Sequence, residues 1–377
     1  MSELEQLLSD LVAIDSINPD LVPGAAGEAA IAAFIADWLR DAGLEVHVTE
    51  VRPARPNVVG IARGAGGGRA LLLNGHVDTV GVAGMSEPLR PRIAGGKLYG
   101  RGAYDMKGGL AACMVAAAEA ARRNLRGDVI VTAVMDEEYA GLGTLAVAEQ
   151  VRADGAIVAE PTELQLVVAH KGFVWLEVET QGVAAHGSRP HLGVDAIAKM
   201  GGVLVGLEGL AAELAHRPPH PLLGPPSVHA STIQGGGEWS TYPDRCTLAI
   251  ERRTLPGETG DAAEAELRAI VARLAAADPT FRAVVRRDLA RAPLETPAGA
   301  PILATVQQAA AGALGRAVET TGVSFWTDAA SLHAAGIPTV LFGPLGAGAH
   351  AAEEWVDLAS VQTCAEVYLA TALAFCA

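Results

Sequence analysis

Short apolar segments that alternate with helical patterns constrain the fold of this chain more than any other feature. The apolar segments, each bounded by Gly, Pro or polar residues, are 57–62, 70–73, 129–134 and 157–159. Helical spacing of apolar residues occurs at 3–14, 28–42, 108–123 and 143–151. Strands that alternate with helices indicate an α/β fold, and we expect a mixed, mostly parallel sheet with helices on both faces.

A different order of elements begins after His170. Strand patterns and amphipathic helices follow in the order β-α-β-β-α-β, at 173–181, 194–214, 228–234, 246–252, 267–274 and 281–289. This order is typical of the split-βαβ, ferredoxin-like α+β unit, which has helices on one face of an antiparallel sheet. The α/β pattern resumes near Pro301, with helices to Leu314 and at 329–335 and a strand at 339–342. We therefore predict one domain from residues 1–170 plus 291–377, interrupted by an inserted domain at 171–290.

Charge and cysteine content limit the functional classes. The chain has 28 Lys and Arg against 43 Asp and Glu, a net charge of −15, which disfavours binding to nucleic acid or to anionic membranes. The 4 cysteines form no C-x-x-C pair, and the N-terminus lacks the pattern of a secretory signal. The longest apolar tract, 109–121, is shorter than a membrane span. We expect a cytoplasmic protein with reduced thiols.

Polar side chains follow the predicted strands at the points where the strands end. They are His76, Asp78, Asp105, Asp136, Glu137, Glu138, Glu160 and His350. Singly, each has an ordinary explanation, such as a surface imidazole or a solvated turn. Together, two histidines and several carboxylates at neighbouring strand ends are the ligands that a pair of divalent cations needs. Asp78 lies two residues after His76, so we expect its carboxylate to accept the spare N–H of that imidazole.

Several motifs, in the same order, make the sequence resemble the M20-type, di-metal aminoacylase and exopeptidase family. The motifs are His76-Val-Asp78-Thr, Gly100-Arg-Gly-Ala-Tyr-Asp105-Met-Lys-Gly-Gly, Asp136-Glu137-Glu138, Glu160-Pro-Thr, Ala185-His186-Gly-Ser-Arg-Pro, Arg252-Arg253-Thr-Leu-Pro-Gly and Gly348-Ala-His350. The family includes acetylornithine deacetylase, succinyl-diaminopimelate desuccinylase and glutamate-releasing carboxypeptidases. The residues of these motifs are most similar to those of the acetylornithine-deacetylase-like branch. The resemblance implies a zinc-exopeptidase-like main domain and an inserted domain that serves as a lid and in dimerisation.

The resemblance also implies a metal centre. In the implied centre Asp105 bridges two divalent ions. Zinc is the expected metal, and cobalt and manganese are alternatives. His76 and Glu160 complete one metal site, and Glu138 and His350 complete the other. The peptide bond after Asp105 is expected to be cis.

The remaining implied roles concern catalysis and substrate. Glu137 is the general base toward a metal-activated water. Asp78 is counted among the catalytic residues through its expected contact with the His76 imidazole. His186, from the partner subunit of a homodimer, polarises the scissile carbonyl. Arg253 binds the substrate carboxylate, with Arg252 as a competing candidate. These roles describe a hydrolase that cleaves the amide bond of N-acylated amino acids.

The sequence disfavours a nucleotide-binding site and two other classes of hydrolase. The glycine run 64–68 lacks the final Gly of a dinucleotide fingerprint and precedes a strand, so a nucleotide site is disfavoured. The sequence has no G-x-S-x-G and no H-E-x-x-H, which argues against a serine hydrolase and a helix-borne zinc protease. A dipeptidase or carboxypeptidase of the same family stays open as an alternative. A catalytically silent binding protein is a weaker one, because no expected ligand or base is missing.

Overall fold

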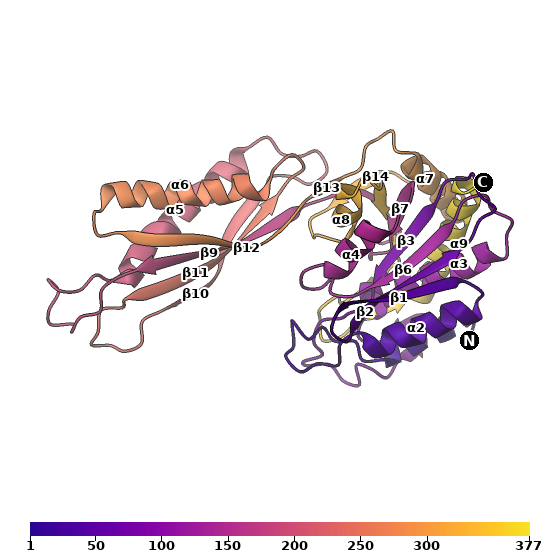
Figure 1. The fold of residues 1–377 in the computed structure, drawn as a ribbon, viewed down its shortest axis with the longest axis horizontal. Helices are drawn as coiled ribbons and strands as arrows, with labels where there is room; N and C mark the ends of the chain where they lie inside the picture. Colours follow the sequence, from indigo (N-terminus) through magenta and orange to yellow (C-terminus); the bar gives the residue numbers. More distant parts are fainter. The chain divides into compact units, whose positions relative to one another are not determined.

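The structure, a computed structural model, describes residues 1–377 and divides into two compact units (Figure 1). Unit 1 comprises Met1–Val168, Thr296–Thr321 and Thr327–Ala377, and unit 2 comprises Ala169–Glu295 with Gly322–Trp326. The short second segment of unit 2 lies outside the inserted domain expected from the sequence. It belongs there because the Trp326 ring packs edge-on against His170 and Phe173, with centroid distances of 6.4 and 5.8 Å.

Unit 1 is built on a mixed sheet whose strands run in the order β1-β2-β6-β3-β7-β15-β8. Their bounds are β1 (Glu45–Arg52), β2 (Arg55–Ala62), β6 (Val129–Val134), β3 (Leu71–His76), β7 (Gly155–Val158), β15 (Thr339–Leu341) and β8 (Leu166–His170). The last residues of β8 enter unit 2 and pair with β13 (Leu294–Glu295), and β14 (Thr320–Val323) also pairs with β8. The strands β6, β3, β7 and β15 are parallel neighbours, whereas both margins are antiparallel. The parallel part is thus confined to the centre.

The central strands are buried because helices cover both faces of the sheet. Every residue of β3, β6 and β7 is buried, as expected for parallel strands with two covered faces. Two neighbouring residues of β3 contact helices on opposite faces of the sheet. The Asn74 side chain donates to Thr144 of α4 (Leu142–Gln150), while a side chain at Gly75 would meet Leu110 of α3 (Gly108–Ala121). Helices on both faces leave the strand ends as the part of the sheet available for a site.

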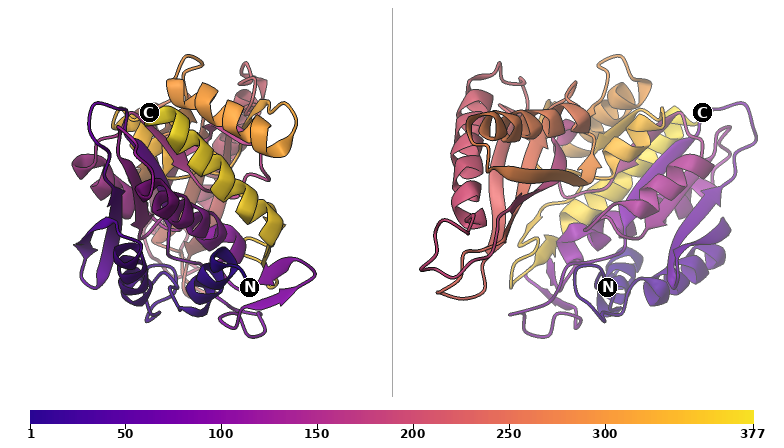
Figure 2. Two further views of the ribbon diagram at one scale, coloured as in Figure 1. Left: turned by 90° about the vertical axis from the view of Figure 1, so that its right-hand side faces the viewer. Right: turned by 60° about the vertical axis from the view of Figure 1, so that its left-hand side comes forward.

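The other helices of unit 1 are α1 (Glu3–Ala13), α2 (Ala29–Asp41), α7 (Pro301–Leu314), α8 (Ala329–Ala334) and α9 (Leu358–Phe375). Figure 2 shows α9, in yellow, lying along unit 1. By length and composition α9 could cross a membrane, but 56% of its apolar window is buried inside the protein, where it packs against α3 and α7. Such burial is typical of a core helix. The sequence pattern did not predict α9, nor the small sheet of β16 (Gly346–Ala347), β17 (Trp355–Asp357), β5 (Lys97–Tyr99) and β4 (Arg92–Ala94).

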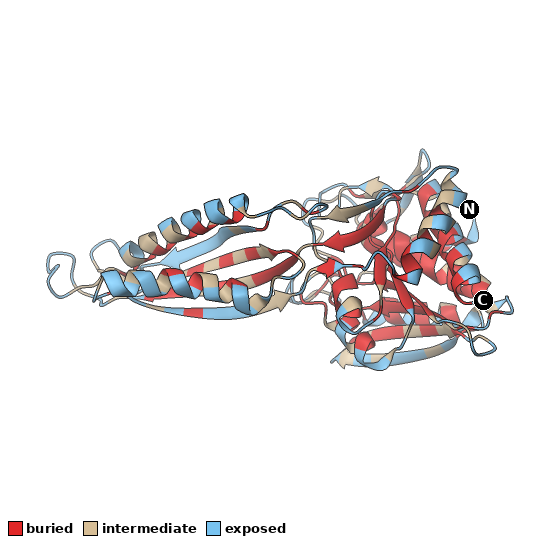
Figure 3. Ribbon diagram, turned by 90° about the horizontal axis from the view of Figure 1, so that it is seen from above, coloured by how far each residue is buried: buried red, intermediate tan, exposed pale blue.

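Unit 2 has the predicted β-α-β-β-α-β order. Its elements are β9 (Gly172–Gln181), α5 (Ala196–His216), β10 (Ser227–Gly235), β11 (Arg245–Thr254), α6 (Gly260–Ala277) and β12 (Arg282–Arg291). The strands form an antiparallel sheet in the order β10-β11-β9-β12. Alternate residues of the sheet, such as Val174, Leu176 and Val178, form one core with Met200 of α5 and Leu267 of α6. Figure 3 shows the buried faces of both helices turned toward this sheet.

Candidate metal centre

The strand order of unit 1 brings three polar segments to one edge of the sheet. His76 is the last residue of β3 and pairs in register with Val134, the last residue of β6. Glu137 and Glu138 follow β6, and Glu160 follows β7, the parallel neighbour on the other side of β3. Because parallel strands end at the same edge, these side chains meet although they are far apart in sequence.

Two loops complete the cluster. Asp105 lies in the one-turn segment Ala103–Lys107, and the Asp105–Met106 peptide bond is cis, as the resemblance implied. His350 follows β16 and has a left-handed backbone, with φ of 62°. The two oxygens of Asp105 point to different imidazoles: Oδ1 is 3.2 Å from His76 Nε2, and Oδ2 is 3.4 Å from His350 Nε2. Asp105 is thus placed between the two histidines.

The remaining carboxylates surround these imidazoles. Around His76 Nε2, Glu160 Oε1 lies at 3.9 Å and Glu137 Oε2 at 4.0 Å. Glu138 Oε2 lies 3.0 Å from His350 Nε2. Side-chain exposure is 5% for Glu138 and Glu160 but 56% for His350, so one side of the cluster is open to solvent.

The donor set fits divalent cations. Two groups have ligand atoms that all lie within 4.8 Å of one another: His76, Glu137 and Glu160, and His76, Asp105 and Glu138. Imidazole nitrogens and carboxylate oxygens are the ligands of zinc, cobalt and manganese. The first group places Glu137, the expected base, within reach of the same cation as His76. The structure therefore brings the expected ligands and the expected base into one cluster.

Crowding of like charges disturbs the ionisation of the cluster. Burial, reinforced by the Glu160 carboxylate, raises the pKa of Glu137. Burial and the nearby Asp105 raise the pKa of Glu138 to about 7. Hydrogen bonds to Asp105 and Glu138 raise the pKa of His350 to about 10. Burial alone would lower the pKa of His76, but the surrounding carboxylates outweigh burial and raise it. Cations bound among these carboxylates would relieve the repulsion.

Asp78 differs from its expected arrangement. The Nδ1 atom of His76 lies 2.9 Å from the backbone carbonyl oxygen of Asp78, whereas the Asp78 carboxylate is 3.6 Å away. The carboxylate instead accepts hydrogen bonds from the backbone N–H groups of Glu137 and Glu138, at 3.1 and 3.2 Å. The expected side-chain partner of His76 was wrong because β3 ends at His76, so strand alternation no longer orients Asp78. Asp78 holds the segment that carries the expected base.

A buried polar network that the sequence did not reveal lies behind Asp78. Asn18 Nδ2 donates to Asp78 at 2.8 Å and to Asp136 at 3.2 Å. Arg55 donates to the Asn18 and Asp136 side chains and forms a bidentate pair with Glu28. Both ions of the Arg55–Glu28 pair are buried. Asp136 therefore serves this network, and the Glu137–Glu138 segment is fixed from two sides.

Asp328 is a further buried carboxylate close to the cluster. Its Oδ2 accepts a hydrogen bond of 2.7 Å from Thr144, whereas its Oδ1 is buried without a hydrogen-bond partner. Burial raises the pKa of Asp328 to about 7. The residue stands at the start of α8 but makes no side-chain cap. The Asp328 carboxylate therefore does not serve as a helix cap.

His186, expected to polarise the scissile carbonyl, and Arg253, expected to bind the substrate carboxylate, both lie in unit 2. His186 is exposed on a segment that forms a β-bridge with Thr241. Arg253 is 30% exposed, and its Nε donates to Glu251 at 2.8 Å. Arg252, the competing candidate, is buried and hydrogen-bonded to Glu258 and Glu266, so its guanidinium is already engaged within unit 2. Arg253 remains the accessible guanidinium of the pair.

Comparisons with known proteins agree with this geometry. The model of "Peptidase family M20/M25/M40" matches residues 72–374. Acetylornithine deacetylase of Myxococcus xanthus is 34% identical over 99% of this chain and 97% of its own length. N-formyl-4-amino-5-aminomethyl-2-methylpyrimidine deformylase of Bacillus subtilis is 30% identical over 99% of this chain and 95% of its own length. A crystal structure of a dinuclear metal-binding M20 peptidase from Bacillus subtilis has a TM-score of 0.76 at 17% identity, over 99% and 97% of the two chains.

Proposed function

Because the chain belongs to peptidase family M20/M25/M40 and is a metal-dependent amidohydrolase, we propose that it removes the acyl group from N-acylated amino acids. One observation carries the proposal: two histidines and four carboxylates converge at the edge of the sheet in unit 1. The two curated relatives are named a deacetylase and a deformylase, which favours deacylation over peptide cleavage. A dipeptidase or carboxypeptidase is the second candidate, because solved structures of similar fold include dipeptidases.

The cluster would hold two divalent ions, with zinc as the proposed metal. His76 and Glu160 would bind one ion, Glu138 and His350 the other, and Asp105 both, since its two oxygens face different imidazoles. When bound, such ions act as Lewis acids and lower the pKa of a water molecule toward neutrality. The residues themselves account for the remaining steps.

Glu137 is the proposed general base. Its carboxylate is 11% exposed, and its position is fixed by the backbone hydrogen bond to Asp78. From there it accepts the proton of the attacking water and returns it to the leaving amine as the amide bond breaks. A single carboxylate can perform both transfers because the proton moves in opposite directions in the two steps.

His186 is proposed to stabilise the negative charge that develops on the carbonyl oxygen. The backbone N–H of Ser188 donates to His186 Nδ1 at 3.2 Å, so the neutral ring carries its proton on Nε2. An exposed Nε2–H is the kind of donor that an oxyanion requires. Arg253 is proposed to bind the substrate carboxylate, for which a guanidinium is well suited.

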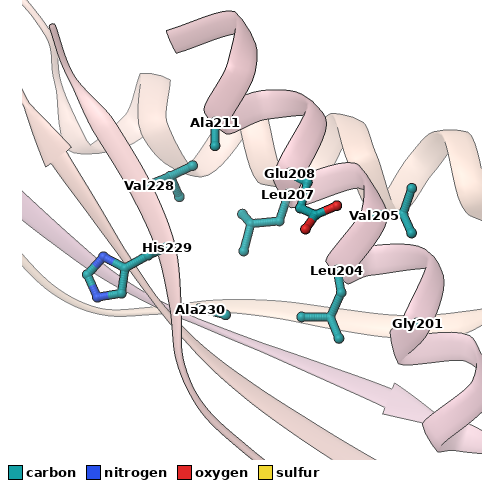
Figure 4. Close-up of a pocket in the computed structure, with 9 residues that line it drawn as sticks. All are labelled: Gly201, Leu204, Val205, Leu207, Glu208, Ala211, Val228, His229 and Ala230. Atoms are coloured by element: carbon teal, nitrogen blue, oxygen red, sulfur yellow. The ribbon is translucent and has the colours of Figure 1, made fainter. Parts of the chain in front are cut away.

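We also propose a homodimer formed through unit 2, with His186 acting in the partner's site. Strand β10 is the outer strand of its sheet and is exposed along nearly its whole length. Figure 4 shows the groove of about 560 Å³ between β10 and α5, where Leu204, Leu207 and Val228 face one another. Val205 of α5 is 71% exposed. An open strand edge beside an apolar helix face is suited to pairing with a second copy.

Two experiments test the dimer. Val205→Asp should shift the molecular mass in light scattering from dimer to monomer, whereas Leu373→Asp, at an exposed site on α9, should not. Mixing the inactive variants His186→Ala and Glu137→Gln should restore activity, because each supplies what the other lacks. A monomeric wild-type protein, or no restored activity after proven subunit exchange, would count against the dimer or against action in the partner's site.

The proposed function is tested by amine release from a panel of N-acyl amino acids and dipeptides, with added Zn²⁺ or Co²⁺ and with chelator as the control. We expect chelator-sensitive hydrolysis of N-acyl amino acids, with acetylated basic amino acids among the best substrates. Cleavage of dipeptides alone would favour the peptidase. No turnover with two metals bound would favour the silent binding protein.

A cytoplasmic location is also proposed, since all four cysteines are free and buried.

A further inference from the structure

The Glu354 carboxylate is buried and organises the backbone around Asp105. Its Oε1 accepts hydrogen bonds from the backbone N–H groups of Tyr104 at 2.9 Å and Asp105 at 3.1 Å. Its Oε2 accepts the backbone N–H of Gly102 at 3.0 Å. These donors come from a loop some 250 residues earlier in the chain, and all three lie in the four residues that end at Asp105, a proposed metal ligand. Sequence patterns did not single out Glu354.

Arg101 extends this link to the segment of His350. Its Nη1 donates to Glu354 Oε2 at 2.7 Å, and its Nη2 donates at 3.0 Å to the backbone oxygen of Ala351, which directly follows His350. The backbone N–H of Gly100 donates to the backbone oxygen of Glu354 at 3.1 Å. The loop of Asp105 and the segment of His350 are therefore joined by side-chain and backbone hydrogen bonds.

Stability alone does not explain the buried ion pair. The side chains of Arg101 and Glu354 are 3% and 0% exposed, and the loss of hydration largely cancels the attraction of such a pair. Arg101 Nε is also buried without a partner, which adds to the cost. The pair instead positions the Asp105 loop relative to the His350 segment. Asp105 can face His76 and His350 at once only if this loop and this segment keep their spacing.

We propose that Glu354 is a positioning residue for the metal centre. Together with Arg101 it fixes the spacing of the Asp105 and His350 segments, so that metal affinity depends on a side chain that donates no ligand atom. The inference rests on the proposed function, because it takes Asp105 and His350 as metal ligands. Residues that orient ligands typically change metal affinity or activity by about 10–100-fold when they are replaced.

The test compares Glu354→Gln with Glu353→Gln, the same change at the exposed neighbouring position. In Glu354→Gln one oxygen becomes an NH₂ group, which would face the N–H of Gly102 or the N–H of Asp105 as donor against donor. The dissociation constant for Zn²⁺ is measured by competition with a chromophoric chelator, and the ligand field by the visible spectrum of the Co²⁺ protein. Glu354→Asp, which keeps the charge but is one methylene shorter, is the second variant should Glu354→Gln fail to fold.

We expect the Glu354 variants to weaken metal binding about 10–100-fold and to alter the Co²⁺ spectrum, while Glu353→Gln matches the wild type. Wild-type affinity and an unchanged spectrum in the folded Glu354 variants would overturn the inference, even if their melting temperatures fell. A wild-type protein that binds no metal would instead refute the proposed metal centre. The two failures are therefore distinguishable.

Discussion

The Asp78 carboxylate accepts the backbone N–H of Glu137 at 3.1 Å, although the two residues are 59 positions apart in the chain. The same carboxylate accepts the N–H of Glu138 at 3.2 Å. One side chain thus fixes the segment that supplies both the proposed base and a proposed ligand. The expected contact between this carboxylate and His76 is replaced by the backbone carbonyl oxygen of Asp78.

Asp78→Asn should lower turnover about 10–100-fold while both metals stay bound. The amide retains one acceptor oxygen, but its NH₂ group must face either Asn18 or the Glu137–Glu138 backbone, all of which donate. Steady-state kinetics and metal content per chain measure the effect. Asp37→Asn, on the exposed surface of α2, is the control. Loss of metal in Asp78→Asn at unchanged fold would show that Asp78 acts on the ligands rather than on the base.

Glu137→Gln should abolish most activity without releasing metal. Removal of a general base typically costs about 10²–10⁴-fold in rate, whereas Glu160→Gln removes a proposed ligand and should release a metal ion. Because Glu137 lies 4.0 Å from His76 Nε2, the structure alone groups it with the ligands, so the comparison is informative. Metal analysis of both purified variants shows whether Glu137 is a base or a metal ligand. Metal loss in Glu137→Gln equal to that in Glu160→Gln would make Glu137 a ligand.

The ends of the central strands could be predicted from the sequence because apolar runs locate buried parallel strands, and such strands end at one edge. This reasoning placed His76, Glu138 and Glu160 at that edge. Asp78 was misjudged because it lies beyond the end of β3, where alternation no longer determines the direction of a side chain.

Glu354 could not be found by pattern, since its partners, three backbone N–H groups and the Arg101 side chain, lie about 250 residues away. Strand β1 was missed because it is a mostly exposed margin of the sheet, without a strongly apolar pattern. The helix α9 was missed although it is apolar and mostly buried, because no strand follows it to extend the alternating pattern.

His333 should make the protein less stable in acid. Burial lowers the pKa of this imidazole on α8, and its Nδ1 is buried without a hydrogen-bond partner. Because the pKa of His333 is lower in the folded than in the unfolded state, protonation favours unfolding. The folded protein keeps its full stability above the unfolded-state pKa of about 6.5 and loses stability as the pH falls below that value. The melting temperature of the wild type should therefore fall more between pH 7.5 and pH 5.5 than that of His333→Gln. His191→Gln, on an exposed loop, controls for the loss of an imidazole, and equal slopes in all three proteins would refute the assignment.

The cysteines should be unreactive in the folded protein. All four are buried free thiols, and burial raises the pKa of each, that of Cys376 to about 11. Because the thiolate is the reactive form, alkylation at pH 8 should be slow before unfolding and complete after it. Mass spectrometry of iodoacetamide-treated protein, with and without guanidinium chloride, measures the difference. Rapid labelling of any cysteine in the native protein would contradict its buried position.

The central claim is that the cluster around Asp105 holds two ions and that amide hydrolysis depends on them. The most direct measurement is a titration of metal-free protein with Zn²⁺, followed by the hydrolysis rate of the best N-acyl amino acid in the panel and by metal analysis. We expect activity to rise from near zero and to level off when two ions are bound per chain, and Asp105→Asn to bind neither ion tightly. Full activity in chelator-treated protein, or two tightly bound ions in Asp105→Asn, would contradict the claim.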